Sequence, residues 1–111
     1  MKISKEEIIR INKNIGGSLI SDSSIDYAIE LQENKKLGEY KKLAYIWRAI
    51  LVDHPFSDAN KRTAIIIAFD FAEQNRKFVD QELLVLQAQS IASKNIKNIR
   101  NIEWRLKNAI H

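Results

Sequence analysis

The fold of this chain depends on the stretch His54-Pro55-Phe56-Ser57-Asp58-Ala59-Asn60-Lys61-Arg62-Thr63-Ala64. It gathers a base, an acid, an amide and two cations, and it leads at once into the apolar run from Ala64 to Phe71. Pro55 disfavours helix at its entry, because the ring restricts the residue before it. A side-chain oxygen of Ser57 or Asp58 can accept from free backbone N–H groups and cap a helix that follows. We therefore predict a polar loop that runs into the first turn of a buried helix.

The cations of this stretch occupy an unfavourable place in the predicted helix. Lys61 and Arg62 fall in the first turn, where the positive end of the helix dipole disfavours a cation by about 0.3–1 kcal/mol. Places that break a local rule are often functional. A bound anion would reverse the effect, because free N–H groups, the dipole and both cations would then favour it. We therefore expect an anion site here, with phosphate as its ligand.

Length and composition indicate one globular domain, residues 1–111. Hydrophobic residues make up 45% and charged residues 29%, which argues against disorder. The chain has no cysteine, which excludes a disulfide framework and a thiolate metal site and agrees with an expected cytoplasmic location. Residues 1–7 lack the apolar core of a signal peptide, and no apolar run approaches the ~20 residues of a membrane span.

The net charge of +4 is compatible with a nucleotide, an acidic protein or a nucleic acid as partner. The basic residues are spread along the chain and form no stripe interleaved with aromatic residues. We therefore do not expect nucleic acid to be the main partner, and we expect no membrane partner.

The pattern of caps and apolar spacings predicts an all-α fold of about six helices, with at most a small hairpin. Ser4-Lys5-Glu6-Glu7 is a capping box that opens a helix of roughly residues 4–14, and Gly16-Gly17 end it. Residues 18–22 then read as a loop or a short hairpin. The other helices are expected from Ser23 or Ser24 to Leu31, from Glu39 to Val52, from Ala59 to about Arg76, from Asp80 to about Ser93, and from Asn98 or Asn101 to the end.

The apolar faces of these helices predict the core. The helix from Ala59 is apolar nearly all round and should be buried at the centre, with Asp70 as a hydrogen-bonded or partly exposed acid. Trp47 is expected in the core and Trp104 at its edge. Further core residues are expected to be Leu43, Ile46, Ile50, Leu51, Leu83, Leu84, Leu86, Ile91, Ile99, Ile102, Leu106 and Ile110.

Residues 54–62, here called the signature loop, resemble the signature of the Fic/Doc family. That signature reads His-x-Phe-x-Asp/Glu-Gly/Ala-Asn-Gly/Lys-Arg, and the chain matches it at His54, Phe56, Asp58, Ala59, Asn60, Lys61 and Arg62. The continuation Ala-Asn-Lys-Arg-Thr-Ala resembles the Doc, or death-on-curing, branch. The resemblance implies a compact Fic-like helical domain that uses ATP and Mg²⁺.

The resemblance also assigns roles within the signature loop. His54 is then the general base that takes a proton from a target hydroxyl, and Asp58 holds Mg²⁺ on nucleotide phosphates. Asn60 and Arg62 face phosphate, and Ala59 and Lys61 complete the nucleotide-binding turn. The purely structural alternatives are an N-cap for Asp58 and a plain loop amide for Asn60. Phe56 is a core anchor under either interpretation, and Thr63 is expected to serve packing.

Two departures from the nucleotidyl-transferring members favour the Doc branch. Those members carry Gly where this chain has Lys61, and a second Arg where it has Ile65. Glycine permits close approach of backbone to phosphate, whereas a lysine side chain fills that space. The Doc branch shares both departures, and it transfers the γ-phosphate of ATP to a hydroxyl of elongation factor Tu. A Doc-like protein kinase is therefore the leading hypothesis, and an AMP transferase or an inactive Fic-fold binding module are the alternatives.

The resemblance further suggests how such an enzyme is controlled. Self-inhibited Fic proteins carry Ser/Thr-x-x-x-Glu-Gly/Asn, but the residue four before the only Glu-Gly/Asn pair, Glu33-Asn34, is Ile29. Restraint is therefore expected in trans, from an antitoxin protein. Residues 18–22 correspond to a flap that can pair with a target segment as an added strand, or they are a plain connection between helices.

Overall fold

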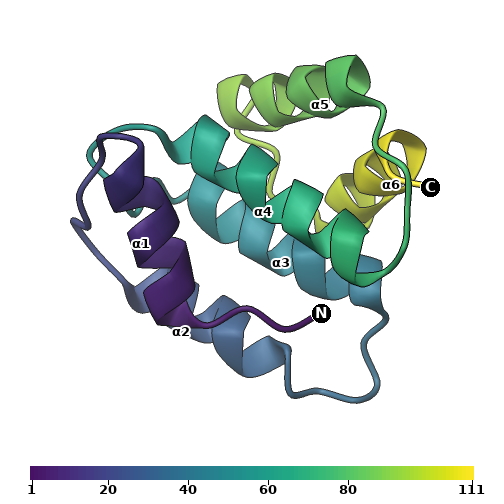
Figure 1. Cartoon of the computed structure of the whole chain (residues 1–111), viewed down its shortest axis with the longest axis horizontal. Coiled ribbons are helices and arrows are strands. Elements are labelled where there is room, and N and C mark those ends of the chain that lie inside the picture. The colour runs from purple at the N-terminus through teal and green to yellow at the C-terminus, as the bar shows by residue number, and fades with distance from the viewer.

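The computed structural model describes all residues from Met1 to His111, and it consists of six α-helices without strands (Figure 1). The predicted all-α class and the number of helices are confirmed. The helices are α1 (Lys5–Asn14), α2 (Ser23–Leu31), α3 (Glu39–Leu51), α4 (Asn60–Gln74), α5 (Gln81–Ser93) and α6 (Ile99–Ala109). None of them combines the length and the apolar character that a membrane span requires.

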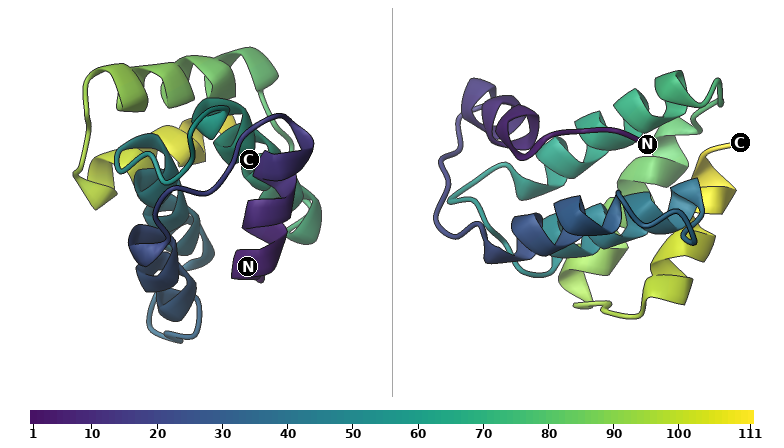
Figure 2. Two further views of the ribbon diagram at one scale, coloured as in Figure 1. Left: turned by 90° about the vertical axis from the view of Figure 1, so that its left-hand side faces the viewer. Right: turned by 90° about the horizontal axis from the view of Figure 1, so that it is seen from below.

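Helices α3 and α4 form the centre of the molecule. Helix α1 packs on α4 and α2 on α3, while α5 and α6 cover the same two helices on the other side (Figures 1 and 2). The molecule measures 31 × 30 × 25 Å. Because α4 begins at Asn60, within the signature loop, this arrangement holds the loop against a rigid core.

The predicted core of α3 is confirmed, and it anchors the first turns of α4. Leu43, Ile46, Trp47, Ile50 and Leu51 are all at most 1% exposed. The indole Nε1 of Trp47 donates a hydrogen bond of 2.9 Å to the carbonyl oxygen of Ala64. This bond joins α3 to α4 just beyond the signature loop.

The prediction that α4 is buried on all sides is wrong. Ile66 and Phe69 are each 39% exposed, because α1, α3 and α5 cover the helix on three sides and leave one face open. Leu86 and Trp104, expected in or at the edge of the core, are 60% and 62% exposed for the same reason: no neighbouring helix covers them. Asp70 accepts from Gln74 Nε2 at 2.9 Å and is partly exposed, as predicted.

The helix caps are confirmed in three of the predicted places. The side chains of Ser4, Asp80 and Asn98 each accept from a backbone N–H in the first turn. Helix α2 differs, because Asp22 rather than Ser23 or Ser24 is its N-cap, and its side chain makes no cap bond. The Asp22 carboxylate accepts from Lys5 Nζ at 2.7 Å instead, which ties α1 to the start of α2.

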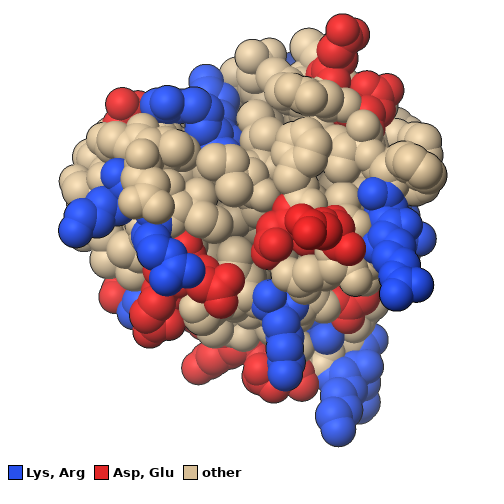
Figure 3. Space-filling model, viewed as in Figure 1, with Lys and Arg blue, Asp and Glu red and all other residues tan.

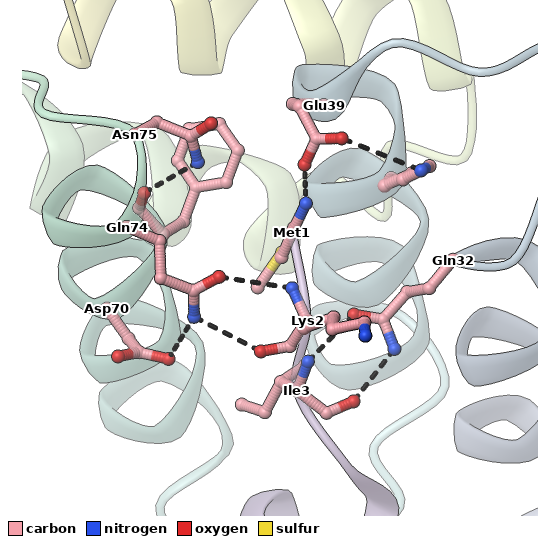
Figure 4. Close-up of polar contacts among 10 residues, drawn as sticks. Met1, Lys2, Ile3, Gln32, Glu39, Asp70, Gln74 and Asn75 are labelled. Carbon is pink, nitrogen blue, oxygen red and sulfur yellow. Dashed lines mark hydrogen bonds and ion pairs between the residues drawn. The ribbon is translucent and has the colours of Figure 1, made fainter. Parts of the chain in front are cut away.

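The N-terminal segment runs between α4 and the α2–α3 side (Figure 4). The side-chain amide of Gln74 exchanges two hydrogen bonds with the backbone of Lys2, and Gln32 does the same with Ile3. The amino group of Met1 forms an ion pair with Glu39 at the start of α3. These contacts hold α1 in place on α4.

Candidate active site

The backbone of the signature loop contains two residues in the left-handed region. His54 has a φ of 49°, and Ala59 has a φ of 62° with a ψ of 25°. This conformation costs a residue with a Cβ atom about 1–2 kcal/mol relative to the right-handed region. Glycine avoids that cost, which gives a physical reason why the signature allows Gly at the place of Ala59. The loop thus keeps a strained turn directly before α4.

Asn60 and Phe56 hold the loop closed. The Asn60 side chain accepts from the Phe56 backbone N–H at 3.3 Å and donates to the Phe56 carbonyl at 3.0 Å. The Phe56 ring is 2% exposed, which confirms it as a core anchor. Asn60 therefore shapes the loop through its own amide, and its expected contact with phosphate stays a prediction.

The start of α4 is not capped as predicted. Asp58 Oδ1 accepts from the adjacent N–H of Ala59 at 2.7 Å, and Ser57 Oγ accepts from Ser18, so neither side chain reaches into α4. Ala59 itself is the N-cap, without a side-chain bond. The N–H groups of Asn60, Lys61 and Arg62 find no acceptor within the protein. Three backbone donors therefore remain free for a ligand.

A cavity of about 420 Å³ opens onto these free donors. Its lining includes all six of the predicted site residues, His54, Asp58, Ala59, Asn60, Lys61 and Arg62. The structure therefore brings the predicted residues together around one cavity, while their chemical roles stay predictions.

The rest of the lining comes from Ser57 of the same loop and from two other parts of the chain, namely Leu51 in α3 and the end of α5 with Ala92 and Ser93. Sequence reasoning missed the residues of α5, because a small apolar residue and a lone serine carry no chemical signature. Only the packing of α5 on α4 places them opposite the signature loop.

The charges around the cavity favour an anion. Lys61 and Arg62 are exposed and form no ion pair, and Asp58 is the one carboxylate in the lining. Lys and Arg side chains gather where α4 begins and α5 ends (Figure 3, upper left). The cations, the free N–H groups and the helix dipole therefore act in the same direction.

The donor set also fits Mg²⁺ bound together with a polyphosphate. One oxygen of Asp58 is used by Ala59, and the other oxygen has no partner in the protein. No group of three or more His, Cys, Asp or Glu side chains forms a metal cage anywhere in the structure. Mg²⁺ commonly binds through one or two carboxylates, substrate phosphates and water, which is what a single carboxylate beside an anion site offers.

Residues 18–22, here called the flap segment, pair with the signature loop rather than with themselves. Leu19 and Phe56 form an isolated antiparallel bridge, so of the two predicted alternatives residues 18–22 adopt the loop and not the short hairpin. The N–H of Ile20 donates to the Pro55 carbonyl at 2.7 Å, and the N–H of Ser57 donates to the Ser18 carbonyl at 2.9 Å. The side chains of Leu19 and Ile20 remain 38% and 69% exposed beside the site.

Asn12 of α1 is a buried polar residue that sequence reasoning missed. It is 0% exposed, and its Nδ2 donates to the Asp58 carbonyl at 2.8 Å and to Thr63 Oγ1 at 3.2 Å. Its Oδ1 has no partner, at a cost of about 1–3 kcal/mol for a buried acceptor. The sequence did contain a signal, because Asn12 lies four residues after Ile8, on the apolar face of the helix.

These observations define an all-α domain in which free N–H groups and two exposed cations at a helix start share a cavity with a histidine. The family model that matches the chain is described as the Fic/DOC family, and it covers residues 2–72, from the N-terminal segment to α4. The chain therefore belongs to the Fic/DOC family. No curated protein and no solved structure matches it. Membership indicates a Fic-type enzyme, a class whose members are typically transferases that modify proteins.

Proposed function

We propose that this protein is a Doc-like toxin of a toxin–antitoxin system, which transfers the γ-phosphate of ATP to a serine or threonine hydroxyl of a protein. The expected target is elongation factor Tu, and its modification would block translation. The observation that carries the proposal is the group of free N–H donors and two unpaired cations at the start of α4, in the cavity that His54 also lines.

Each residue of the site has a defined part in this reaction. His54 accepts the proton of the target hydroxyl while the new O–P bond forms, and the bond between the γ-phosphorus and the ADP oxygen breaks. The free N–H groups, Arg62 and Lys61 offset the charge on the transferred group and on ADP. Mg²⁺, held by Asp58 and the phosphates, would add further neutralisation when it is bound.

Lys61 and Ile65 favour transfer of the γ-phosphate over transfer of AMP. In the AMP-transfer pose the β- and γ-phosphates lie at the helix start, where Lys61 would crowd them. Ile65 is partly buried and packs against the core, so no second guanidinium reaches the γ-phosphate from that position. The reversed pose puts the γ-phosphate beside His54, where both cations can offset its charge.

The experiment that tests the proposal follows a label from ATP to protein. The purified protein is incubated with a lysate or with elongation factor Tu, and with ATP labelled on either the α- or the γ-phosphate. We expect label on the target only from the γ-position, together with the mass increase of one phosphate. Label from the α-position would overturn the assignment in favour of an AMP transferase. Label from neither position would instead favour an inactive binding module.

A variant at Lys61 tests the part of this residue in the proposed reaction. Lys61→Gly should lose phosphoryl transfer, because the cation that stabilises the reversed pose is gone. Lys35→Gly is the matched control, because Lys35 is an exposed lysine without an ion pair, in the loop between α2 and α3, and it does not line the cavity. Undiminished phosphoryl transfer by Lys61→Gly would remove Lys61 from the proposed mechanism.

A further inference from the structure

Asn12 spans the first turn of α4 with a single nitrogen atom. Its Nδ2 donates to the Asp58 carbonyl, before the helix, and to Thr63 Oγ1, inside it. Thr63 Oγ1 in turn donates to the carbonyl of Ala59 at 2.7 Å. One side chain of α1 therefore connects both ends of the turn that carries the free N–H groups.

Only a group with two hydrogens on one atom meets the requirements of this position. The Asp58 carbonyl can only accept, and the hydroxyl hydrogen of Thr63 is already used on Ala59. A hydroxyl in place of the amide would supply one hydrogen, and an ionised carboxylate would supply none. The position therefore requires the amide nitrogen with its two hydrogens, and the amide oxygen Oδ1 has no hydrogen-bond partner.

The peptide between Asp58 and Ala59 is held at both of its polar ends. Asn12 binds its carbonyl oxygen, and Asp58 Oδ1 binds its N–H at 2.7 Å. This peptide precedes Ala59, whose left-handed φ of 62° sets the direction in which α4 departs. We propose that Asn12 is a positioning residue, which fixes this peptide and thereby directs the free N–H groups of residues 60–62 into the cavity, where they would hold the phosphates. The inference rests on the function proposed above.

Gly17 leaves the space that Asn12 needs. A Cβ atom at Gly17 would lie 2.2 Å from Asn12 Oδ1 and 2.5 Å from Nδ2, so any larger residue would displace the amide. The N–H of Gly17 also donates to the Asn12 carbonyl at 3.0 Å. Gly17, directly before the flap segment, and the start of α4 therefore both lie against Asn12.

The first test separates positioning from stability without using nucleotide. Backbone amide chemical shifts are compared between the wild type and Asn12→Ala, with Leu106→Ala as the control. Leu106 is a buried residue of α6 that does not line the cavity. The C-terminal end of α6 bonds to the start of α5, whereas the cavity lies at the opposite end of α5. We expect the amide chemical shifts of residues 60–62 to change in Asn12→Ala and to be unchanged in Leu106→Ala. Unchanged shifts in Asn12→Ala would overturn the inference.

The second test measures the affinity for ADP with Mg²⁺ by calorimetry. Asn12→Ala should weaken binding by about tenfold or more, because the donors lose their preset direction, while Leu106→Ala binds as the wild type does. Gly17→Ala should weaken ADP binding in the wild-type background. In the Asn12→Ala background it should cause no further loss of affinity, because the Asn12 amide that its Cβ would displace is absent. Independent, additive losses would overturn the role of Gly17 and Asn12 as one unit.

The two tests keep this inference apart from the proposed function. A wild type that binds no nucleotide would contradict the proposed function, while the amide shifts would still support or overturn the positioning by Asn12. Normal ADP affinity in a folded Asn12→Ala variant would overturn the inference and leave the proposed function intact.

Discussion

At the scale of single residues, the proposed function assigns proton transfer and phosphate binding to different side chains of the site. His54 is exposed and lines the cavity, and it makes no hydrogen bond that the fold depends on. Arg62 is also exposed and stands at the positive end of α4. Substitution of either residue should therefore report on chemistry or on binding, with little effect on folding.

His54→Ala should lower phosphoryl transfer by about 10²-fold or more and leave the binding of ATP with Mg²⁺ nearly unchanged. Arg62→Ala is the matched contrast and should weaken binding itself, because a charge-assisted contact to phosphate is lost. Single-turnover kinetics and calorimetric titration measure the two effects separately. Full transfer by a folded His54→Ala variant would rule out the general-base assignment.

The left-handed turn at Ala59 gives a prediction about stability. Ala59→Gly should be neutral or should raise the free energy of unfolding by about 1 kcal/mol at most, since relief of backbone strain is partly offset by the greater freedom of glycine in the unfolded chain. Ala64→Gly, in the right-handed interior of α4, should lower the free energy of unfolding by at least about 0.5–1 kcal/mol. Urea denaturation compares the two variants, and equal losses would contradict the strained turn.

At the scale of elements, the position of α1 decides the geometry of the loop. Helix α1 supplies Asn12 to the signature loop and Lys5 to the start of α2. Lys5 Nζ lies 2.7 Å from Asp22 and 2.9 Å from Asp26, and its hydrogen bond holds the pKa of the Asp22 carboxyl below its usual value. The pair thus links two helices on either side of the flap segment.

The lowered pKa of Asp22 predicts how stability depends on pH. Its contribution is present above the unfolded pKa of about 3.9 and is lost as the pH falls through the lower pKa of the folded state. Asp22→Asn should therefore be slightly less stable than the wild type at pH 7, and the difference should vanish in acid. Asp53→Asn, at an exposed carboxyl without an ion pair, is the control. A difference in melting temperature that persists at pH 2 would show that the ion pair is not its cause.

At the scale of the whole molecule, α5 completes the wall of a cavity that the signature loop begins. The family match ends at residue 72, within α4, yet Ala92 and Ser93 at the end of α5 form part of the cavity wall. The cavity is therefore a property of the complete helical domain rather than of the signature loop alone.

The lack of the inhibitory signature within the chain predicts control in trans. Expression should arrest growth of a susceptible host, and coexpression of a partner from an adjacent gene should relieve the arrest. We expect that partner to contain an amphipathic, partly disordered segment that folds on this domain. Expression of His54→Ala at the same level is the control and should be harmless. Full activity in a stable equimolar complex with the partner would contradict control in trans.

The sequence by itself determined the helices and the identity of the site residues. Caps and apolar spacings are local signals, so the six helices and the core of α3 could be predicted from neighbours along the chain. The signature loop likewise placed His54, Asp58 and Arg62 within a few residues of one another, which made their convergence on one cavity predictable.

Only the tertiary structure decided which partners those residues meet. The Asp58 side chain turned to Ala59 instead of capping α4, and the left-handed turn followed from contacts with Asn12 and Asn60. The exposure of Ile66 and Phe69 depended on which faces of α4 the other helices cover. Local patterns record the preference of each segment, whereas pairing between distant segments depends on packing. The donors of this site are free because the first N–H groups of a helix have no acceptor within it, and because Ser57 and Asp58 bond elsewhere in the fold instead of capping α4.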